Sequence, residues 1–206
     1  MGTLSGIASP EGKGEKPMVS LSSSAKGDLG VARALVAFWS EAGPERWFER
    51  DTAFDRVFHE RFLAAHEAAA AGELADWSAS PTGALALVLL LDQFPRNCFR
   101  GVPRMYATDA QARAVAAAAI EAGHDRQVEQ ALRVFFYLPF QHAEDLADQD
   151  RSVALHQAFY PSYLQYAEGH RDIIRRFGRF PHRNAILGRA TTPEEQHFLD
   201  EGGFVG

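Results

Sequence analysis

Hydrophobic residues recur at helical spacing along most of the chain. Between residues 28 and 43 apolar side chains fall every three or four positions, and Gly43 ends the pattern. Phenylalanines follow at four-residue spacing in the next stretch, at Phe54, Phe58 and Phe62. Such spacing places apolar side chains on one face of an α-helix. The pattern therefore predicts two amphipathic helices in this part of the chain.

The rest of the chain predicts further helices. Segment 81–94 is apolar on nearly all sides, which is typical of a central helix covered by others. An alanine-rich pattern occupies 109–123, and two longer patterns follow at about 127–148 and 150–177. The sequence TTPEE at 191–195 has the form of a capping box that begins a last short helix. No stretch alternates with the period of two that a half-buried strand requires. We therefore expect an all-α fold, a single domain of about seven helices.

Composition separates a leader from this domain. Residues 1–28 are rich in Gly, Ser, Lys and Pro and lack the continuous apolar core of a signal peptide. We expect them to form a disordered leader, which either belongs to the natural chain or was added to it. Residues 29–206 would form the all-helical domain. The chain of 206 residues is 46% hydrophobic and 23% charged, which is ordinary for a globular protein with one core.

Charge and cysteine content exclude several classes of function. The formal net charge of -6 disfavours a general nucleic-acid or anionic-membrane surface. The longest apolar run, around 84–91, is far shorter than the roughly 20 residues that cross a bilayer. The single cysteine, Cys98, excludes an internal disulfide and is typical of a reducing cytoplasm. We expect a cytoplasmic protein without a cofactor and without nucleic-acid or membrane partners; the oligomeric state stays open.

The helix predicted at 81–94 continues into charged residues without changing face. Asp92, Arg96 and Arg100 lie on the face that is apolar in the two preceding turns. Pro95 removes one helical hydrogen bond and is expected to kink the helix. A core face that becomes acidic and then basic predicts a buried polar site. The alternative is an ordinary Asp92–Arg96 pair at a helix end that has reached solvent.

His142 lies on the apolar face of the helix predicted at 127–148. Tyr137 and Glu144 belong to the polar face of the same helix. Pro139 would free main-chain carbonyls nearby, which favours a pocket. A histidine in such a place is more often a hydrogen-bonded core residue than a catalyst. Both interpretations of His142 stay open.

The segment RFGRFPHRN at 176–184 combines three arginines with core-type aromatic residues. It follows a helical stripe that contains His170, which either lines a site or is a core histidine bonded to the backbone. The irregular turn that follows presents four polar side chains: Arg179, His182, Arg183 and Asn184. Carboxylates for these arginines are available at Asp92, Glu144 and Asp148. A polar cluster is predicted where three helices and this turn converge.

Taken in order, these segments resemble the bacterial family known as domain of unknown function 924. The resemblance rests on FW at 38–39, WF at 47–48 and the words LALVLLLDQFPRN, FFYLPFQHAED, RFGRFPHRN, LGR and TTPEE. It covers nearly all of residues 33–200 and leaves the leader outside. It implies an all-α fold similar to tetratricopeptide-like helical arrays. It implies no particular activity.

Spacings typical of metal sites occur in the chain but are incomplete. The pair His142 and Glu144 has the His-x-Glu spacing of zinc deaminases, whose second motif requires two cysteines where this chain has one. Glu-x-x-His occurs at 121–124 and 194–197, but helix ends interrupt the geometry of a di-iron bundle. We therefore predict no metal site.

Two functions fit the predicted polar cluster. In the first, the chain is a binding protein or an enzyme for a small molecule, expected to be anionic, and the reaction is left open. The residues expected to move protons are His142, Glu144, His170 and His182. The residues expected to bind the substrate are Asp92, Arg96, Tyr137, Arg179, Arg183 and Asn184. In the second, the chain is a helical-array adaptor whose charges only lock helix packing. The five arginines of these segments outnumber their three acidic residues, which favours the small molecule.

Overall fold

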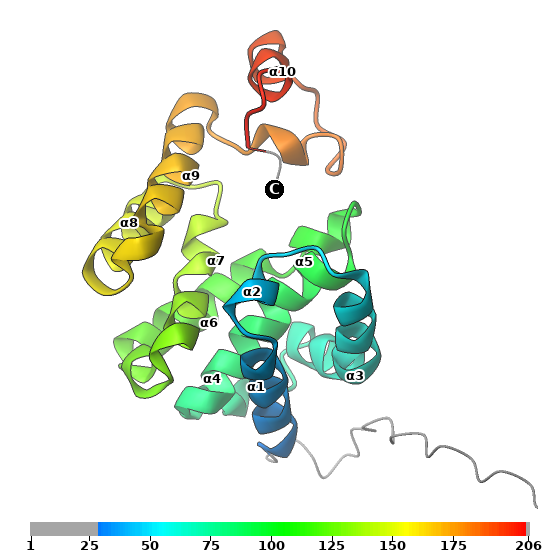
Figure 1. Ribbon diagram of the computed structural model, residues 1–206, viewed down its shortest axis with the longest axis vertical. Coiled ribbons are helices and arrows are strands. Elements are labelled where there is room, and N and C mark those ends of the chain that lie inside the picture. Colours follow the sequence, from blue (N-terminus) through cyan, green and yellow to red (C-terminus); the bar gives the residue numbers. More distant parts are fainter. Residues whose placement is uncertain (1–28, 205–206) are drawn as a thin grey trace, which may run out of the picture.

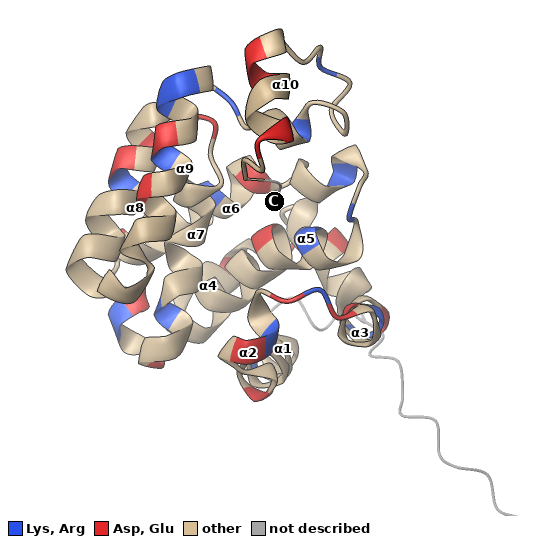
Figure 2. Ribbon diagram, turned by 45° about the horizontal axis from the view of Figure 1, so that its top comes forward, with Lys and Arg blue, Asp and Glu red and all other residues tan. Residues whose placement is uncertain are grey.

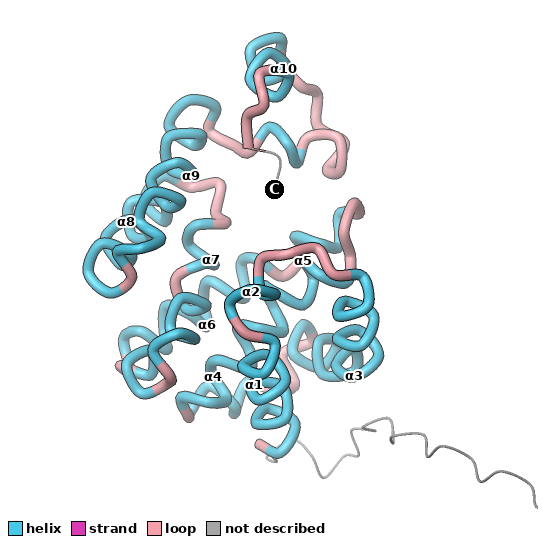
Figure 3. Tube along the Cα trace, viewed as in Figure 1, coloured by secondary structure: helices cyan, strands magenta, loops and turns pink. Residues whose placement is uncertain are grey.

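The computed structural model of the protein describes residues 29–204, which form an all-α fold (Figure 1). Throughout this range the chain consists of helices, turns and loops, without a strand (Figure 3). The helices are α1 (Gly30–Ala42), α2 (Pro44–Trp47), α3 (Thr52–Ala70), α4 (Pro81–Val88), α5 (Phe94–Cys98), α6 (Asp109–Glu121), α7 (Leu138–Gln141), α8 (Leu146–Phe159), α9 (Leu164–Phe177) and α10 (Pro193–Asp200). The all-α prediction is confirmed, and a tetratricopeptide-like arrangement stays a prediction. The predicted leader, residues 1–28, lies outside the described residues.

Short helical turns connect these helices. Six are 3₁₀ turns: Ala75–Ala79, Pro103–Tyr106, His124–Gln127, Gln130–Phe136, Pro161–Tyr163 and Pro181–Arg183. A seventh, Leu89–Gln93, is a π turn between α4 and α5. Over the described residues, no helix has both the length and the apolar character needed to cross a membrane.

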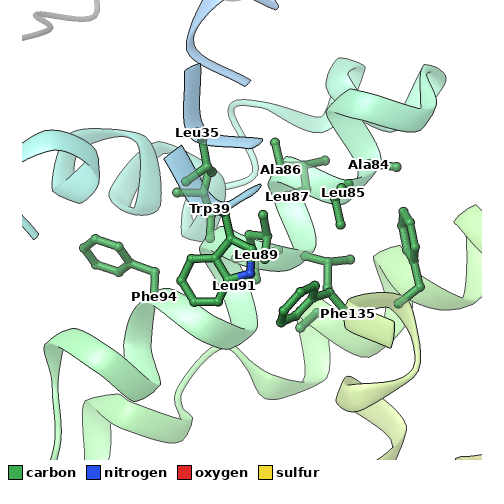
Figure 4. Close-up of a cluster of buried hydrophobic side chains, with 14 of the residues drawn as sticks. Leu35, Trp39, Ala84, Leu85, Ala86, Leu87, Leu89, Leu91, Phe94 and Phe135 are labelled. Carbon is green, nitrogen blue, oxygen red and sulfur yellow. The ribbon is translucent and has the colours of Figure 1, made fainter. Parts of the chain in front are cut away.

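Helix α4 lies at the centre of the hydrophobic core. Every residue from Gly83 to Val88 is buried, because α1, α6 and the turn Ala75–Ala79 pack around the helix. Leu85 lies in the cluster of Figure 4 together with Trp39 and Phe135. The helix carries no charged residue and is entirely tan in Figure 2. The prediction of a central helix is confirmed.

Stacked aromatic rings join α1 to α3. The centroids of Phe38 and Phe54 are 4.9 Å apart, and those of Trp39 and Phe58 are 5.3 Å apart. Ring pairs at these separations contribute about 0.5 to 1.5 kcal/mol each beyond the area they bury. Helix α3 begins where the side chain of Asp51 accepts hydrogen bonds from two main-chain N–H groups of the first turn. The predicted amphipathic helices are therefore present and face each other.

The chain departs from the prediction where α4 meets its proline. We expected a kinked helix through Pro95, but the chain instead widens into the π turn Leu89–Gln93 and α5 begins at Phe94. Proline cannot donate a hydrogen bond and its ring clashes with the carbonyl four residues earlier, so an extra residue in the preceding turn relieves both conflicts. Helix α5 ends at Cys98. Arg100 therefore lies beyond the helix and not on the face shared by Asp92 and Arg96.

The prediction of one continuous helix over 127–148 is wrong. The chain forms the turn Gln130–Phe136, the single helical turn α7 and then a non-helical link that reaches Asp145. The side chain of Asp145 accepts a hydrogen bond from the N–H of Asp148 and starts α8 as a new helix. Local capping and Pro139 thus override the apolar periodicity of the segment. Tyr137 and His142 consequently do not share one continuous helix.

The pattern predicted at 150–177 divides at a proline. Helix α8 ends at Phe159, Pro161 opens a 3₁₀ turn, and α9 begins at Leu164. The two helices pack against each other (Figure 1). Arg171 and Arg175 of α9 both approach Asp150 of α8, at 3.6 and 3.5 Å. The ribbons of this pair accordingly carry both charge colours in Figure 2.

The capping box predicted at TTPEE is present. The Thr192 hydroxyl accepts a hydrogen bond from the N–H of Glu195, whose carboxylate accepts one from the N–H of Thr192. Pro193 occupies the first turn of α10. The short helix predicted at this point is confirmed.

Candidate functional site

A cavity of about 480 Å³ lies where α5, α7, α9 and the turn Pro181–Arg183 meet. The polar part of its wall includes Gln93, Arg96, Arg100, His142 and Arg183. These side chains come from three separate stretches of sequence. The π turn, the end of α7 and the turn after α9 therefore build one site.

Asp92 is buried directly behind this polar wall. Its side chain is closed to solvent and accepts a hydrogen bond from Gln93 Nε2 at 2.5 Å. Arg96 Nη1 and His142 Nδ1 reach the same oxygen, Oδ1, at 3.0 and 2.8 Å. Burial alone would raise the pKa of Asp92, but Arg96 and His142 together with these hydrogen bonds lower it to about 2. Asp92 is therefore a carboxylate at neutral pH.

Asp109 is a second acidic residue of the cluster. It is the first residue of α6, where the helix dipole favours a negative charge. Arg96 donates to both carboxylate oxygens of Asp109, at 2.9 and 3.1 Å. Burial lowers the pKa of Arg96, but Asp92 and Asp109 outweigh that effect and raise it. The two terminal nitrogens of Arg96 are thus occupied by protein groups.

His142 joins Asp92 to the cavity. Since the Asp92 carboxylate can only accept, the neutral imidazole carries its proton on Nδ1 and leaves Nε2 as the basic nitrogen. Within residues 29–204, Nε2 has no hydrogen-bond partner, and His142 lines the cavity. Burial and Arg96 lower the pKa of His142, so the imidazole is neutral at pH 7. A neutral histidine oriented by a buried carboxylate has the geometry of a general base.

Arg183 is a buried cation held between two aromatic rings. Its guanidinium carbon lies 4.5 Å from the ring centroid of Tyr106 and 4.5 Å from that of Phe180. One terminal nitrogen donates to the main-chain oxygen of His142 at 3.0 Å. The other is 3.7 Å from Asp109, beyond hydrogen-bond distance, and Nε has no partner in the described part of the chain. Arg183 therefore keeps hydrogen-bond donors that no protein acceptor uses.

Two more histidines line the cavity, His170 and His182. The Nδ1 of His170 lies 2.7 Å from the main-chain oxygen of Tyr166. Burial lowers the pKa of each imidazole to about 4. Both rings contact the ring of Phe204, with centroid separations of 4.5 and 5.1 Å. At neutral pH these two histidines are uncharged.

Five of the predicted site residues do not line the cavity: Asp92, Tyr137, Glu144, Arg179 and Asn184. Glu144 accepts hydrogen bonds from Arg189 and from the N–H of Phe180, and Arg179 and Asn184 both donate to Glu195. The hydroxyl of Tyr137 donates to Asp125 at 2.9 Å. Glu144 thus attaches the segment 178–195 to the link between α7 and α8, and Arg179 and Asn184 make contacts within that segment. The structure instead brings together Arg96, His142, His170, His182 and Arg183 at the cavity, and Asp92 is buried behind Arg96 and His142.

The expected excess of arginines over acids does not hold. Arg100 pairs with Asp55, Arg133 donates to the main-chain oxygen of Asp125, and Asp148 pairs with Arg113. Three arginines line the cavity: Arg96 pairs with Asp92 and Asp109, Arg100 pairs with Asp55, and Arg183 lies 3.7 Å from Asp109. Glu49 lines the cavity as well. Sequence reasoning missed Asp109, Asp55 and Glu195 because it sought acidic partners only within the segments that carry the arginines. An excess of positive charge therefore does not support an anion site. The feature that favours one is that Arg183 has hydrogen-bond donors that the protein does not use.

Other chemistry is limited in this part of the chain. Over residues 29–204, no group of three or more His, Cys, Asp or Glu side chains could hold a metal ion. Burial and the nearby Asp55 raise the pKa of the Cys98 thiol to about 12, so it is not a thiolate nucleophile at neutral pH. The arrangement can accept a proton at His142 and donate charge-assisted hydrogen bonds from Arg183.

Comparisons with known proteins agree on a family and a fold. A sequence model described as "Bacterial protein of unknown function (DUF924)" matches residues 35–203, a range that contains the whole polar cluster. A solved structure of a protein of unknown function from Agrobacterium tumefaciens is 59% identical. That similarity covers 84% of this chain and 98% of the other, with a TM-score of 0.81. No curated protein matches the sequence.

Proposed function

The chain belongs to the bacterial family of unknown function DUF924, and we propose that it binds a small anionic molecule in the cavity beside Asp92. The unused donors of Arg183 carry this proposal. A buried guanidinium that makes one hydrogen bond loses hydration and gains too few hydrogen bonds in return. A carboxylate or phosphate in the cavity would supply an acceptor to Nη1 of Arg183, whereas Nε is closed to solvent.

Arg100 supports the same ligand. Its side chain is one-third exposed, lines the cavity and pairs with Asp55 through Nε at 3.3 Å. Its terminal nitrogens have no hydrogen-bond partner among residues 29–204. Arg96 has the opposite role, because both of its terminal nitrogens are held by Asp92 and Asp109. Arg96 would position the carboxylates and would not contact the ligand directly.

His142 would act as a general base on the bound molecule. A ligand hydroxyl or a water molecule within reach of Nε2 would lose its proton to the imidazole. The Asp92 carboxylate would stabilise the imidazolium that forms, as the acidic member of a catalytic triad does. The proposal thus includes an acid–base enzyme as well as a binding protein.

The adaptor hypothesis retains one supporting observation. Arg96, Arg179 and Arg189 each pair with carboxylates of the protein. Such pairs are expected if the charges only hold the helices together. This pairing does not account for Arg183, which lines the cavity, donates one hydrogen bond to the main-chain oxygen of His142 and lies 3.7 Å from Asp109. We therefore favour the small-molecule ligand.

A thermal-shift assay with sulfate, phosphate and short carboxylates at millimolar concentration tests the proposal. A ligand that binds only the folded state raises Tm in proportion to its saturation. The shift should be present in the wild type and lost in Arg183→Ala. The control is Arg175→Ala, which removes a half-exposed arginine of α9 that does not line the cavity. Equal shifts in the wild type and in both variants would reject the cavity as an anion site.

Arg183→Ala can also weaken the fold, so a second variant is needed. Arg100→Ala removes a more exposed side chain whose pairing with Asp55 is long. A reduced shift in Arg100→Ala, with an unchanged Tm in the absence of ligand, would support the proposal independently of stability.

A further inference from the structure

Apart from Glu49, Asn97, Met105, Leu138 and Gln141, the rest of the cavity wall is aromatic. It includes the side chains of Trp47, Phe48, Tyr163, Tyr166 and Phe204. Trp47 ends α2 and Phe48 follows it. Tyr163 precedes α9, Tyr166 belongs to α9, and Phe204 is the last residue that the structure describes. The same cavity is therefore polar where α5, α7 and the turn Pro181–Arg183 form it, and apolar where these rings do.

Three of these rings are exposed to a degree unusual for large apolar side chains. Phe48 is 49% exposed, Tyr166 54% and Phe204 39%. They come from segments far apart in the sequence and meet at one cavity. Isolated exposed apolar residues need no explanation, but a cluster around a cavity marks a binding surface.

The rings are placed to contact one flat group. Tyr163 is within 5.8 Å of Phe48 and 5.7 Å of Tyr166, measured between centroids, so the three rings follow one another along the wall. Phe204 packs on His170 and His182, which also line the cavity. Aromatic faces at such separations favour stacking or edge contacts with another ring.

We infer that the ligand is an amphipathic anion, in which a carboxylate or phosphate head is joined to an aromatic ring. This inference rests on the proposed function, because it takes Arg183 and Arg100 as the site of the anionic head. The ring would lie against Phe48, Tyr163 and Tyr166. A volume of about 480 Å³ is within the range of drug-sized ligand pockets and much larger than an inorganic anion needs.

Three probes of matched structure test the ligand class by titration calorimetry at pH 7. The first, 3-phenylpropionate, carries both the ring and the charge. The second, 3-phenylpropionamide, keeps the ring without the charge, and the third, propionate, keeps the charge without the ring. We expect 3-phenylpropionate to bind at least 10-fold more tightly than either of the others. Phenyl phosphate serves as a second probe with both parts, so that the choice of head group does not decide the result.

Two variants test the aromatic wall. Phe48→Ala and Tyr166→Ala each remove a half-exposed ring and should weaken 3-phenylpropionate binding about 5- to 10-fold, the effect of one lost ring contact. Phe159→Ala is the control, because Phe159 is a similarly exposed ring of α8 that does not line the cavity. Unchanged binding in Phe48→Ala and Tyr166→Ala would overturn the placement of the ring.

The outcomes separate this inference from the proposed function. Equal affinity for propionate and 3-phenylpropionate would overturn the aromatic ligand and leave the anion site intact. Equal affinity for 3-phenylpropionamide and 3-phenylpropionate would instead reject the anion site. If neither 3-phenylpropionate nor phenyl phosphate binds at 10 mM while inorganic phosphate does, the amphipathic ligand is rejected and the proposed function stands.

Discussion

His142 Nδ1 lies 2.8 Å from Asp92 Oδ1, although 50 residues separate them in the sequence. The contact joins the end of α7 to the π turn that follows α4. Both groups are withdrawn from bulk water, so the hydrogen bond depends on the charge of Asp92 and on the tautomer of His142. Stability and acid–base chemistry thus depend on the same two side chains.

Removal of the Asp92 carboxylate should destabilise the fold. Asp92→Ala leaves Gln93 and His142 without their acceptor, and we expect a loss of about 2 to 4 kcal/mol in the free energy of unfolding. Urea denaturation of the wild type and the variant measures this loss. Asp150→Ala is the control, because that carboxylate is half exposed and its pairs with Arg171 and Arg175 should contribute less than about 1 kcal/mol. An unchanged midpoint for Asp92→Ala would show that the polar cluster is not a stabilising network.

Arg183→Ala should cost less stability than Asp92→Ala. Arg183 makes one hydrogen bond and two cation–π contacts, while its interaction with Asp109 is long. We expect a loss of about 1 to 3 kcal/mol, measured by the same urea denaturation. A larger loss than that of Asp92→Ala would mean that Arg183 is already fully satisfied by the protein and would argue against an anion site.

Buried histidines should make the protein sensitive to mild acid. Burial lowers the pKa of His170 and His182 to about 4, whereas in the unfolded chain it is near 6.5. Between these values the unfolded state binds more protons, so stability is complete above about pH 6.5 and falls as the pH decreases toward 4. Each histidine can account for about 3 kcal/mol at most over that range. Denaturation midpoints at pH 7 and pH 5 measure the effect.

His182→Gln isolates one contribution to this pH dependence. The variant lacks one titrating group, so its stability should fall less between pH 7 and pH 5 than that of the wild type. His197→Gln is the matched control, because His197 lies on α10 and its side chain is largely exposed. The same loss of stability in all three proteins would contradict the assigned role of burial.

Two glycines in helices should respond to alanine in opposite ways. A Cβ at Gly83 of α4 would clash with the main-chain oxygen of Trp77 and lie 2.9 Å from Ser80 Oγ, so Gly83→Ala should destabilise by about 1 to 3 kcal/mol. Gly169 of α9 has no atom within 4 Å of the same position, and Gly169→Ala should stabilise by about 0.5 to 1 kcal/mol. Thermal unfolding of both variants decides the question. A shift of Tm in the same direction would contradict this difference in packing.

The parts of the fold that depend on local patterns could be predicted from the sequence. The phenylalanine spacing of α3 and the capping box at Thr192 are properties of neighbouring residues. The pairing of Asp92 with Arg96 follows equally from a spacing of four. Segment 127–148 was mispredicted because Pro139 and the cap at Asp145 outweigh apolar periodicity.

The cavity itself could be predicted only in part. Arg183 and Asp92 were expected near each other because both interrupt apolar segments with charge. The contact of Arg183 with Tyr106 and its approach to Asp109 depend on how the chain returns after α5, and no spacing in the sequence encodes that return. The aromatic wall was missed because Phe48 and Tyr166 look like ordinary core residues until their exposure is known.

Because of the π turn Leu89–Gln93, this segment cannot be a regular α-helix and also keep the geometry of the site. It corresponds to a one-residue insertion into an otherwise α-helical run. Deletion of Leu90 would restore the α-helical register, but it would rotate everything before the deletion by about 100° relative to everything after it. Either the core leucines of α4 or the Asp92–His142 pair would then face the wrong way. A shortened helix at this point would therefore be more regular and yet lose the site.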